Sequence, residues 1–391
     1  RGRDARFRVS NATTVLNVTR ANTQQFNETV DSLTSGTGSV AQNTNGNYGV
    51  LTAPATNDKA VEQTYMYVSN FYGTARVAYI TGCLNESGGS TTGLSIRMGM
   101  FDDPDDKATG SDSTDGNGHF LKLDDGSLSF VEHSSVRGSE VESVVSQSNW
   151  NVDKMDGTGL SKFTLDTAKT IVLIIESGYH SVRMGFMFDD IFVVAHRFLH
   201  TQVSEPFVKT MTLPVRWDIE NRSAGASSVA LRSMDAIVQT ENASVQTPLY
   251  RNQIIKDNTV SVNTTRSPVM SIRLAANGTR KVLSLNRIHL LVDTGDQLGW
   301  QLVINPTLTG ATFTAVTSSD ALVDISATAY TGGTVVAGGY FTDLNVQTIV
   351  IESILARAAI DGTTDIITLA CANDFGAGTA DIAAGFSWSE L

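Results

Sequence analysis

Cysteine and proline are scarce in this sequence. Its 391 residues include two cysteines, Cys83 and Cys371, and seven prolines. Two cysteines exclude a disulfide framework and the usual cysteine-based zinc sites, which need more thiols. We therefore expect both side chains to be small buried apolar groups rather than a functional pair.

Basic residues are also few relative to acidic ones. Lys and Arg number 28 against 40 Asp and Glu, which gives a formal net charge of −12. Phosphate binding depends on clustered Lys and Arg, so this balance argues against a nucleic-acid partner and against binding to anionic membrane surfaces. Long apolar runs are missing as well. Stretches such as Ile171–Ile175 are far too short to span a bilayer, so we expect no membrane insertion.

The sequence is rich in the pattern of β-strands joined by tight turns. Glycine occurs 33 times, and Ser and Thr are also abundant. In SVRMGFMF (Ser181–Phe188) alternate residues share one apolar face, which is the period of a strand. Asp189-Asp190 then forms a turn, and Ile191–Phe198 is the second strand of the hairpin. Asp125-Gly126 marks the tip of a second hairpin.

Short strands at regular spacing predict an all-β fold of two β-sandwich domains, the larger one jelly-roll-like. The length supports two domains because single cores rarely grow past about 250–300 residues. The polar stretch Thr240–Thr265 is the expected boundary. We therefore expect a large sandwich (46–245) and a smaller C-terminal sandwich (246–391). Residues 1–45 are expected to form an N-terminal arm that pairs with a neighbouring subunit. The strand candidates are Gln63–Val68, Ala75–Thr81, Leu94–Phe101, Lys122–Phe130, Met211–Glu220, Ser228–Gln239, Val269–Leu274, Arg287–Val292, Leu298–Ile304, Gly333–Phe341, Asp365–Cys371 and Ile382–Trp388.

Helix signals are weak throughout the chain. The best candidate is Leu344–Ala359, but its centre, Val346–Ile351, is mostly β-branched and fits a strand as well. Both interpretations stay open, and the strand is favoured.

Four aspartates gather in FDDPDD, and they are our candidate metal ligands: Asp102, Asp103, Asp105 and Asp106. Oxygen-rich loops suit calcium. The alternative is a solvated acidic turn, which such a run forms more often. The following run, DSTDGNG (Asp112–Gly118), lacks the spacing of an EF-hand loop. We therefore expect no cofactor, with calcium at these aspartates as the alternative.

The residue patterns of common catalytic sites are missing. His196 and His200 would lie about 13 Å apart on one side of an extended segment, too far for one metal ion. We therefore expect hydrogen-bonded histidines at a strand end. No serine lies in a nucleophile turn such as G-x-S-x-G, and no glycine-rich phosphate loop occurs. Carboxylate spacing does not identify a glycosidase pair. We predict that the protein is not an enzyme.

Four tryptophans offer a further hypothesis. Exposed aromatic rings stack on sugars, but residues of this size more often fill sandwich cores, because each buries a large apolar area. The core is therefore favoured over a sugar-binding surface for Trp150, Trp217, Trp300 and Trp388.

Three blocks of the sequence carry a resemblance. The first is IRMGMFDD (Ile96–Asp103), followed by the Asp125-Gly126 hairpin. The second runs from Gln147 to Ile219 and includes SNWNVDKMDGTG, FTLDTAK, RMGFMFDDIFVVAHRF and LPVRWDI. The third runs from RIHLLVDTGDQLGWQLVINPTLTGATFTAV through TGGTVVAGGYF and GTTDIITLACA to FSWSEL. Together they cover well over half the chain. In this order they resemble virion structural proteins of tailed phages and large aquatic DNA viruses.

The resemblance implies positions that shape turns and packing, and no catalytic residues. The recurring positions are Trp150, Asn151, Asp153, Asp156, Gly157, Gly159, Pro214, Arg216, Asn305 and Pro306. The chain departs from the family at Tyr179-His180, where small residues are usual, and at Asp190, where the family has glycine. Asp190 must therefore adopt a left-handed backbone conformation that glycine takes more easily.

The resemblance implies a location in a virion more firmly than it implies a task. The expected function is that of a viral structural protein, capsid-associated or part of a fibre or spike, that acts by self-assembly and attachment to the particle. By analogy with β-rich viral spikes we expect a homotrimer, with other capsid or tail proteins as partners. The alternative is a lectin-like, carbohydrate- or receptor-binding module of a fibre tip, with a host surface glycan as its ligand.

Overall fold

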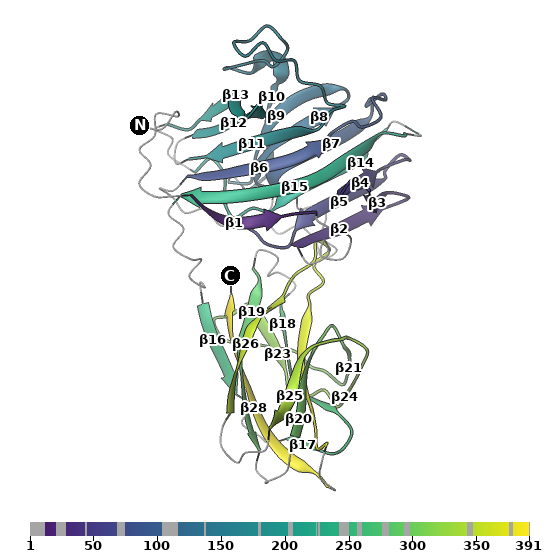
Figure 1. The fold of residues 1–391 in the computed structure, drawn as a ribbon, viewed down its shortest axis with the longest axis vertical. Coiled ribbons are helices and arrows are strands. Elements are labelled where there is room, and N and C mark those ends of the chain that lie inside the picture. The colour runs from purple at the N-terminus through teal and green to yellow at the C-terminus, as the bar shows by residue number, and fades with distance from the viewer. Residues whose placement is uncertain are drawn as a thin grey trace. The chain divides into compact units, whose positions relative to one another are not determined.

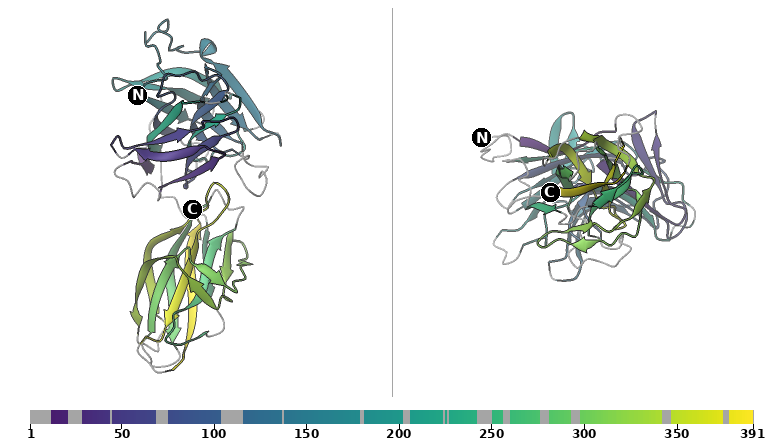
Figure 2. Two further views of the ribbon diagram at one scale, coloured as in Figure 1. Left: turned by 90° about the vertical axis from the view of Figure 1, so that its right-hand side faces the viewer. Right: turned by 90° about the horizontal axis from the view of Figure 1, so that it is seen from below.

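The computed structural model divides the chain into two compact units, Arg1–Ser244 and Val245–Leu391. Both are built from antiparallel sheets, and the fold is all-β (Figures 1 and 2). The expected boundary, between residues 245 and 246, lies within about one residue of this division. The structure describes residues 12–20, 29–43, 45–68, 75–103, 116–136, 138–178, 181–201, 206–223, 225, 227–241, 250–255, 260–275, 281–292, 298–341, 347–374 and 378–390.

The N-terminal unit is a sandwich of an eight-stranded and a seven-stranded sheet. The eight-stranded sheet has the order β13-β12-β11-β6-β15-β4-β3, and β1 also pairs with β15. Its strands are β1 (Ala12–Val18), β3 (Ser39–Asn43), β4 (Tyr48–Thr52), β6 (Arg76–Cys83), β11 (Ile171–Ser177), β12 (Ser181–Phe188), β13 (Ile191–Leu199) and β15 (Ala230–Glu241).

The seven-stranded sheet has the order β10-β9-β8-β7-β14-β5-β2. Its strands are β2 (Val30–Ser35), β5 (Lys59–Thr64), β7 (Leu94–Phe101), β8 (Gly118–Asp124), β9 (Ser127–Ser134), β10 (Val141–Ser146) and β14 (Val215–Asn221). A short 3-10 helix, η2 (Gln147–Asn149), follows β10.

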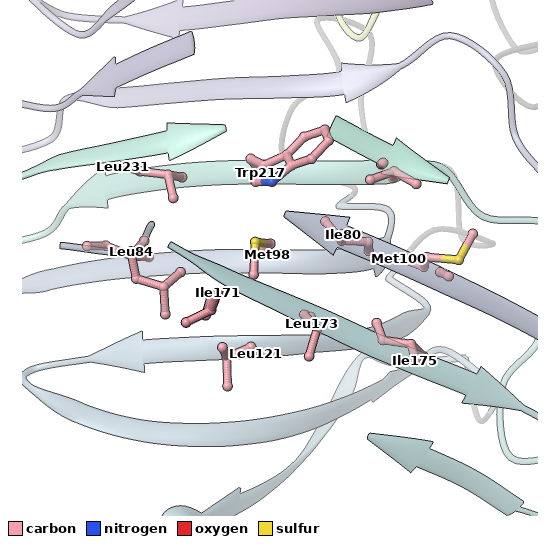
Figure 3. Close-up of a cluster of buried hydrophobic side chains, with 14 of the residues drawn as sticks. Ile80, Leu84, Met98, Met100, Leu121, Ile171, Leu173, Ile175, Trp217 and Leu231 are labelled. Carbon is pink, nitrogen blue, oxygen red and sulfur yellow. The ribbon is translucent and has the colours of Figure 1, made fainter. Parts of the chain in front are cut away.

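The two sheets enclose one apolar core. Because side chains alternate along a strand, each sheet sends every second residue inward. Figure 3 shows side chains of both sheets meeting in this core: Met98, Met100, Leu121 and Trp217 from one sheet, and Ile80, Ile171, Leu173 and Ile175 from the other. The Trp217 indole N–H donates to the carbonyl of Thr81 at 3.2 Å, so its polar atom is satisfied inside the core.

The C-terminal unit has a separate core between a five-stranded and a six-stranded sheet, with a two-stranded ribbon beside them. The five-stranded sheet contains β16 (Tyr250–Ile255), β17 (Val260–Val262), β19 (Leu283–Val292), β26 (Gln347–Ala356) and β28 (Ala380–Glu390). The six-stranded sheet contains β18 (Ser267–Leu274), β20 (Leu298–Ile304), β22 (Thr314–Ala315), β23 (Ala321–Asp324), β25 (Thr334–Phe341) and β27 (Ile366–Ala372). The ribbon pairs β21 (Thr307–Thr309) with β24 (Ala329–Thr331).

The expectation of an N-terminal arm over residues 1–45 is wrong for the part that the structure describes. There, β1, β2 and β3 are strands of the two sheets, and Leu16, Val18 and Val30 belong to the core. Their partners β15 and β5 come later in the chain. Few inward apolar residues are enough for such edge positions, so the local sequence looked like a polar arm.

The predicted hairpin between β12 and β13 is confirmed, and its turn explains the aspartate pair. Asp189 and Asp190 have φ of 44° and 61°. Positive φ at both turn residues matches the twist of the flanking strands. Aspartate tolerates this conformation at modest cost. The centre of Leu344–Ala359, for which a helix was the less favoured alternative, forms the strand β26.

Both cysteines are free and buried, in different units, as their scarcity predicted. Burial raises the pKa of the Cys371 thiol to about 12. The described part of the chain contains no helix with the length and hydropathy needed to cross a membrane.

Candidate functional site

Charged side chains gather on the face of the seven-stranded sheet that points away from the core. Alternation along β7 and β14 turns Met98 and Trp217 inward. It puts Arg97, Arg216 and Asp218 on the opposite, outer face. Two further residues interact with them from the end of β7 and from β5. We call the five residues the arginine cluster: Arg97, Arg216, Asp218, Asp103 and Gln63.

Asp218 is the centre of the arginine cluster. Arg97 donates from Nε and Nη2 to its two carboxylate oxygens, both at 2.8 Å. Arg216 donates from Nε to Asp218 Oδ2 at 2.7 Å and from Nη1 to Gln63 Oε1 at 3.1 Å. Arg97 Nη2 also donates to Asp103 Oδ2 at 2.6 Å. Such bidentate pairs fix the orientation of the guanidinium planes.

The cluster is closed to solvent although it lies outside the core. Arg216 is 0% exposed and Asp218 is 1% exposed. Aromatic rings cover the guanidinium groups. The Phe101 ring centre lies 5.1 Å from Cζ of Arg97 and 5.3 Å from Cζ of Arg216. Phe120 lies 5.7 Å from Cζ of Arg97.

The charges in the cluster depend on one another. Burial alone would raise the pKa of Asp218, but Arg97 and Arg216 outweigh it and hold that pKa below its usual value. Burial would likewise lower the pKa of Arg97, yet Asp218 and Asp103 raise it well above the ordinary value. The carboxylates therefore stay ionised and the arginines stay protonated. This arrangement is a fixed ion network and contains no group poised to exchange a proton at neutral pH.

Two of the four candidate calcium ligands are engaged in this network or beside it. Asp102 is buried, and its Oδ1 accepts the backbone N–H of Asn117 at 2.8 Å. Asp103 pairs with Arg97. Asp105 and Asp106 lie outside the described residues. Within the described residues, no group of three or more His, Cys, Asp or Glu side chains is arranged to hold a metal ion.

We expect calcium to leave the thermal stability of the N-terminal unit unchanged. Asp103 already pairs with Arg97 through largely buried side chains, and drawing its carboxylate towards a cation would weaken that pair at a cost greater than that of an exposed ion pair. Melting curves with excess chelator and with millimolar CaCl₂ test this. A melting temperature that rises with calcium concentration would show that the four-aspartate site forms, since a ligand that binds only the folded state stabilises it.

A second polar group joins two histidines through Glu132. His119 Nε2 and His200 Nε2 lie 3.0 and 2.8 Å from the same oxygen, Glu132 Oε2. Phe207 stacks on His200, with ring centres 4.2 Å apart. Burial would raise the pKa of Glu132, but hydrogen bonds from both histidines lower it to about 2. The group links the β8–β9 hairpin to the residue that follows β13.

His196 and His200 behave as the sequence predicted, as hydrogen-bonded histidines at a strand end. His196 Nδ1 accepts the backbone N–H of Asn151 at 3.3 Å, whereas His200 reaches Glu132. Burial lowers the pKa of His196. The two rings therefore have different partners and do not form a joint site.

The segment SNWNVDKMDGTG (Ser148–Gly159) packs along the outer edge of β13. Trp150 stacks on Phe130, with ring centres 4.3 Å apart. The Asn151 side chain accepts the N–H of Arg197 and donates to its carbonyl, both at 2.9 Å. The backbone N–H groups of Val152 and Asp153 donate to Ala195. This segment covers the free edge of β13 in the way that natural proteins protect edge strands.

The following turn is organised by Asp153. Its carboxylate accepts the N–H groups of Met155 and Ser161 at 2.9 and 2.7 Å. A Cβ at Gly159 would lie 2.0 Å from Asp153 Oδ1, so any other residue there would displace the carboxylate. Gly157 has φ of +82°. These positions are occupied by residues that the turn itself requires.

The same holds for Asn305 in the C-terminal unit. Asn305 has φ of 55°, donates to Asp365 Oδ1 at 2.7 Å and accepts the N–H of Ile366 at 2.8 Å. The four tryptophans fill the two cores, with exposed fractions of at most 7%. The interpretation of the tryptophans as core residues is therefore confirmed.

The arginine cluster was missed in the sequence because its burial depends on the folded chain. Arg97 and the pair Arg216–Asp218 occur in strands that were predicted. They alternate there with apolar residues, and charged residues in such positions are normally solvated. A signal was present nevertheless. Arg216 and Asp218 are opposite charges two positions apart, so in a strand they lie on the same face and can pair.

No protein-family model and no curated protein matches the chain. Solved structures with partial similarity exist. The carbohydrate recognition domain of Emp46p in its potassium-bound form is 13% identical, with a TM-score of 0.36, over 57% of this chain and 95% of that chain. A legume lectin-like domain from Entamoeba histolytica is 10% identical, with a TM-score of 0.33, over 59% of this chain and 98% of that chain.

A protein of Shiga toxin-encoding bacteriophage phi24B, described as a conserved carbohydrate esterase, is similar over 59% of this chain and 100% of that chain. Its identity is 11% and its TM-score 0.35. Scores this low establish no shared binding or catalytic site, so the function is argued from the residues of this chain.

Proposed function

We propose that this chain is a non-enzymatic structural component of a virion that works by associating with copies of itself and with other proteins of the particle. The observation that carries the proposal is how the motif residues are used. Trp150, Asn151, Asp153, Gly159 and Asn305 carry the resemblance to virion proteins, and each of them supports a turn, a strand edge or the core. A sequence pattern of this kind maintains a fold and places no reactive group.

The polar clusters support the same conclusion. Asp218, the centre of the arginine cluster, is held by two arginines, and Glu132 is held by two histidines. A general acid or base has to reach its substrate and exchange a proton near the working pH. Asp218 and Glu132 are instead closed in and have pKa values well below neutrality. Both carboxylates connect neighbouring segments of the fold through hydrogen bonds and ion pairs.

Glycan binding is the second candidate. Tyr340 favours it, because this residue of β25 is 68% exposed and a phenol ring can stack on a sugar while its hydroxyl forms hydrogen bonds. The four tryptophans do not form a sugar-binding surface, since all four indoles are buried. Among the described residues, Tyr340 is the exposed aromatic side chain on which a glycan site would be tested first.

Electron microscopy of the concentrated chain, together with a glycan array, separates the two functions. The structural proposal predicts regular multimers of defined size and no saturable glycan binding. Dispersed single particles that bind one glycan class, with binding abolished in Tyr340→Ala, would replace the proposal by the lectin function. Tyr79→Ala, at a partly buried tyrosine of the N-terminal unit, is the matched control for loss of a tyrosine.

A further inference from the structure

Residues 297–342 form an unusually uncharged stretch. Asp, Glu, Lys and Arg make up 17% of the chain, so about eight would be expected in these 46 residues. The stretch contains two, Asp320 and Asp324, and it has no Lys, Arg, Glu or His. A core segment would explain such a composition by burial. Here the explanation fails, because most residues from 325 to 340 are exposed.

Both aspartates have partners within the unit. Asp324 is 1% exposed, and its Oδ1 accepts the N–H groups of Thr312 and Ser326 at 2.7 and 3.0 Å. Asp324 therefore organises the loops around it. Asp320 pairs with Lys281 at 2.5 Å. Besides Lys281, Arg273 of β18 reaches this region, and its guanidinium lies 4.3 Å from the ring centre of Phe313.

Many exposed residues of this stretch belong to β25, at one edge of the six-stranded sheet, and to the β21–β24 ribbon, whose strands follow β20 and precede β25 in the chain (Figure 1). We call the exposed surface of β25 and this ribbon the uncharged face. Its exposed residues include Thr307, Thr309, Ala329, Thr331, Thr334, Val335, Val336 and Tyr340.

The apolar centre of the uncharged face is on β25. Val335 is 53% exposed, Val336 43% and Tyr340 68%. Val335 and Val336 are both exposed because the pairing with β20 shifts register between Ala337 and Val335, which leaves Val336 as an extra residue. In the described part of the sheet, β25 pairs only with β20, so its other edge has no strand beside it.

The net charge determines which partner this surface fits. Each copy of the chain carries −12, so two copies repel wherever acidic surfaces meet. The centres of protein–protein interfaces are depleted in charged residues and enriched in aromatic ones. A basic partner would be attracted to the acidic surface of the chain and not to a face without charges. A second copy of this chain avoids like-charge contacts only where both surfaces are neutral.

We propose that the uncharged face is the surface through which copies of this chain bind one another. The inference rests on the proposed function and names its contact surface and its partner. The contact is made by side chains of β25 and the β21–β24 ribbon. Added salt strengthens it, because screening weakens the repulsion between two acidic molecules while neutral contacts are unaffected.

The test introduces charge into the uncharged face of the full chain. Val335→Lys and Tyr340→Lys each place an ammonium group at an exposed position, so the fold is retained. Val144→Lys is the matched control, since Val144 is also a valine of an edge strand and is 54% exposed, but it lies on β10 of the N-terminal unit. Sedimentation equilibrium at low and high salt measures the association constant, and thermal melting checks folding.

We expect both variants of the uncharged face to weaken association at least tenfold, and Val144→Lys to change it less than twofold. Association of the wild type should strengthen with salt. If the wild type associates but Val335→Lys and Tyr340→Lys associate equally well, self-association stands and the contact surface is a different one. If the wild type stays monomeric under all conditions, self-association itself is overturned, and this inference is overturned with it.

Discussion

Replacing Asp218 by Ala should destabilise the N-terminal unit by about 3–5 kcal/mol. The change removes the carboxylate that accepts three hydrogen bonds from Arg97 and Arg216 and leaves two guanidinium groups buried side by side. Breaking a buried ion network by removing one partner is costly, because the remaining charges keep their desolvation penalty. Urea unfolding at pH 7 measures the loss.

Glu220→Gln is the matched control for this prediction. Glu220 lies on β14 with Asp218, on the same outer face, and is only partly buried. Surface changes of this kind usually stay within about 0.5 kcal/mol. An Asp218→Ala variant as stable as the control would show that water reaches the two arginines and that the cluster is not closed.

The N-terminal unit should lose stability as the pH falls, in two windows. Burial lowers the pKa of His133 and of His196 below 6.5, so the unfolded chain takes up these protons first and stability falls as the pH drops below about 6.5. Glu132 has a folded pKa of about 2 against an ordinary value of 4.5. Its contribution is therefore complete above about pH 4.5 and is lost as the pH falls towards 2. The shift corresponds to about 3 kcal/mol.

Unfolding by urea at a series of pH values from 7 to 3 tests the second window through Glu132→Gln. This variant should be less stable than the wild type at pH 7, and the difference should shrink below pH 4.5. Glu220→Gln again serves as the control, with a pH profile parallel to that of the wild type. A difference between Glu132→Gln and wild type that is constant across the whole range would contradict the assigned role of the Glu132 charge.

Local pattern was sufficient to predict the long strands with regular alternation. Leu94–Phe101 and Leu298–Ile304 were predicted with the bounds that the structure has, because strict alternation between clear turn residues defines a strand without reference to the rest of the chain. The hairpin at Asp189-Asp190 was predictable for the same reason.

Features that depend on distant partners were not predictable in this way. The strand β1 pairs with β15, whose residues lie more than two hundred positions later, so its few inward residues gave no local signal. The burial of Arg97 and Arg216 depends on Asp218, Asp103 and the rings that cover them. A single strand cannot reveal that its outward face is covered.

The candidate calcium ligands show what composition leaves open. Asp102 accepts a backbone N–H and Asp103 pairs with Arg97, whereas Asp105 and Asp106 lie outside the described residues, so the calcium site stays a prediction. Carboxylates close together in sequence can be divided among separate structural tasks, and only the fold decides which. The uncharged stretch 297–342, in contrast, is visible in the sequence, but its exposure is not.

The central claim is that this chain is an assembling structural protein, and its mass in solution tests that claim most directly. Light scattering of the purified chain over a hundredfold range of concentration should give a mass that rises from 41.8 kDa to a defined multiple. A limiting value of three copies would agree with the expected homotrimer. A mass of 41.8 kDa at every concentration, at both low and high salt, would contradict the account.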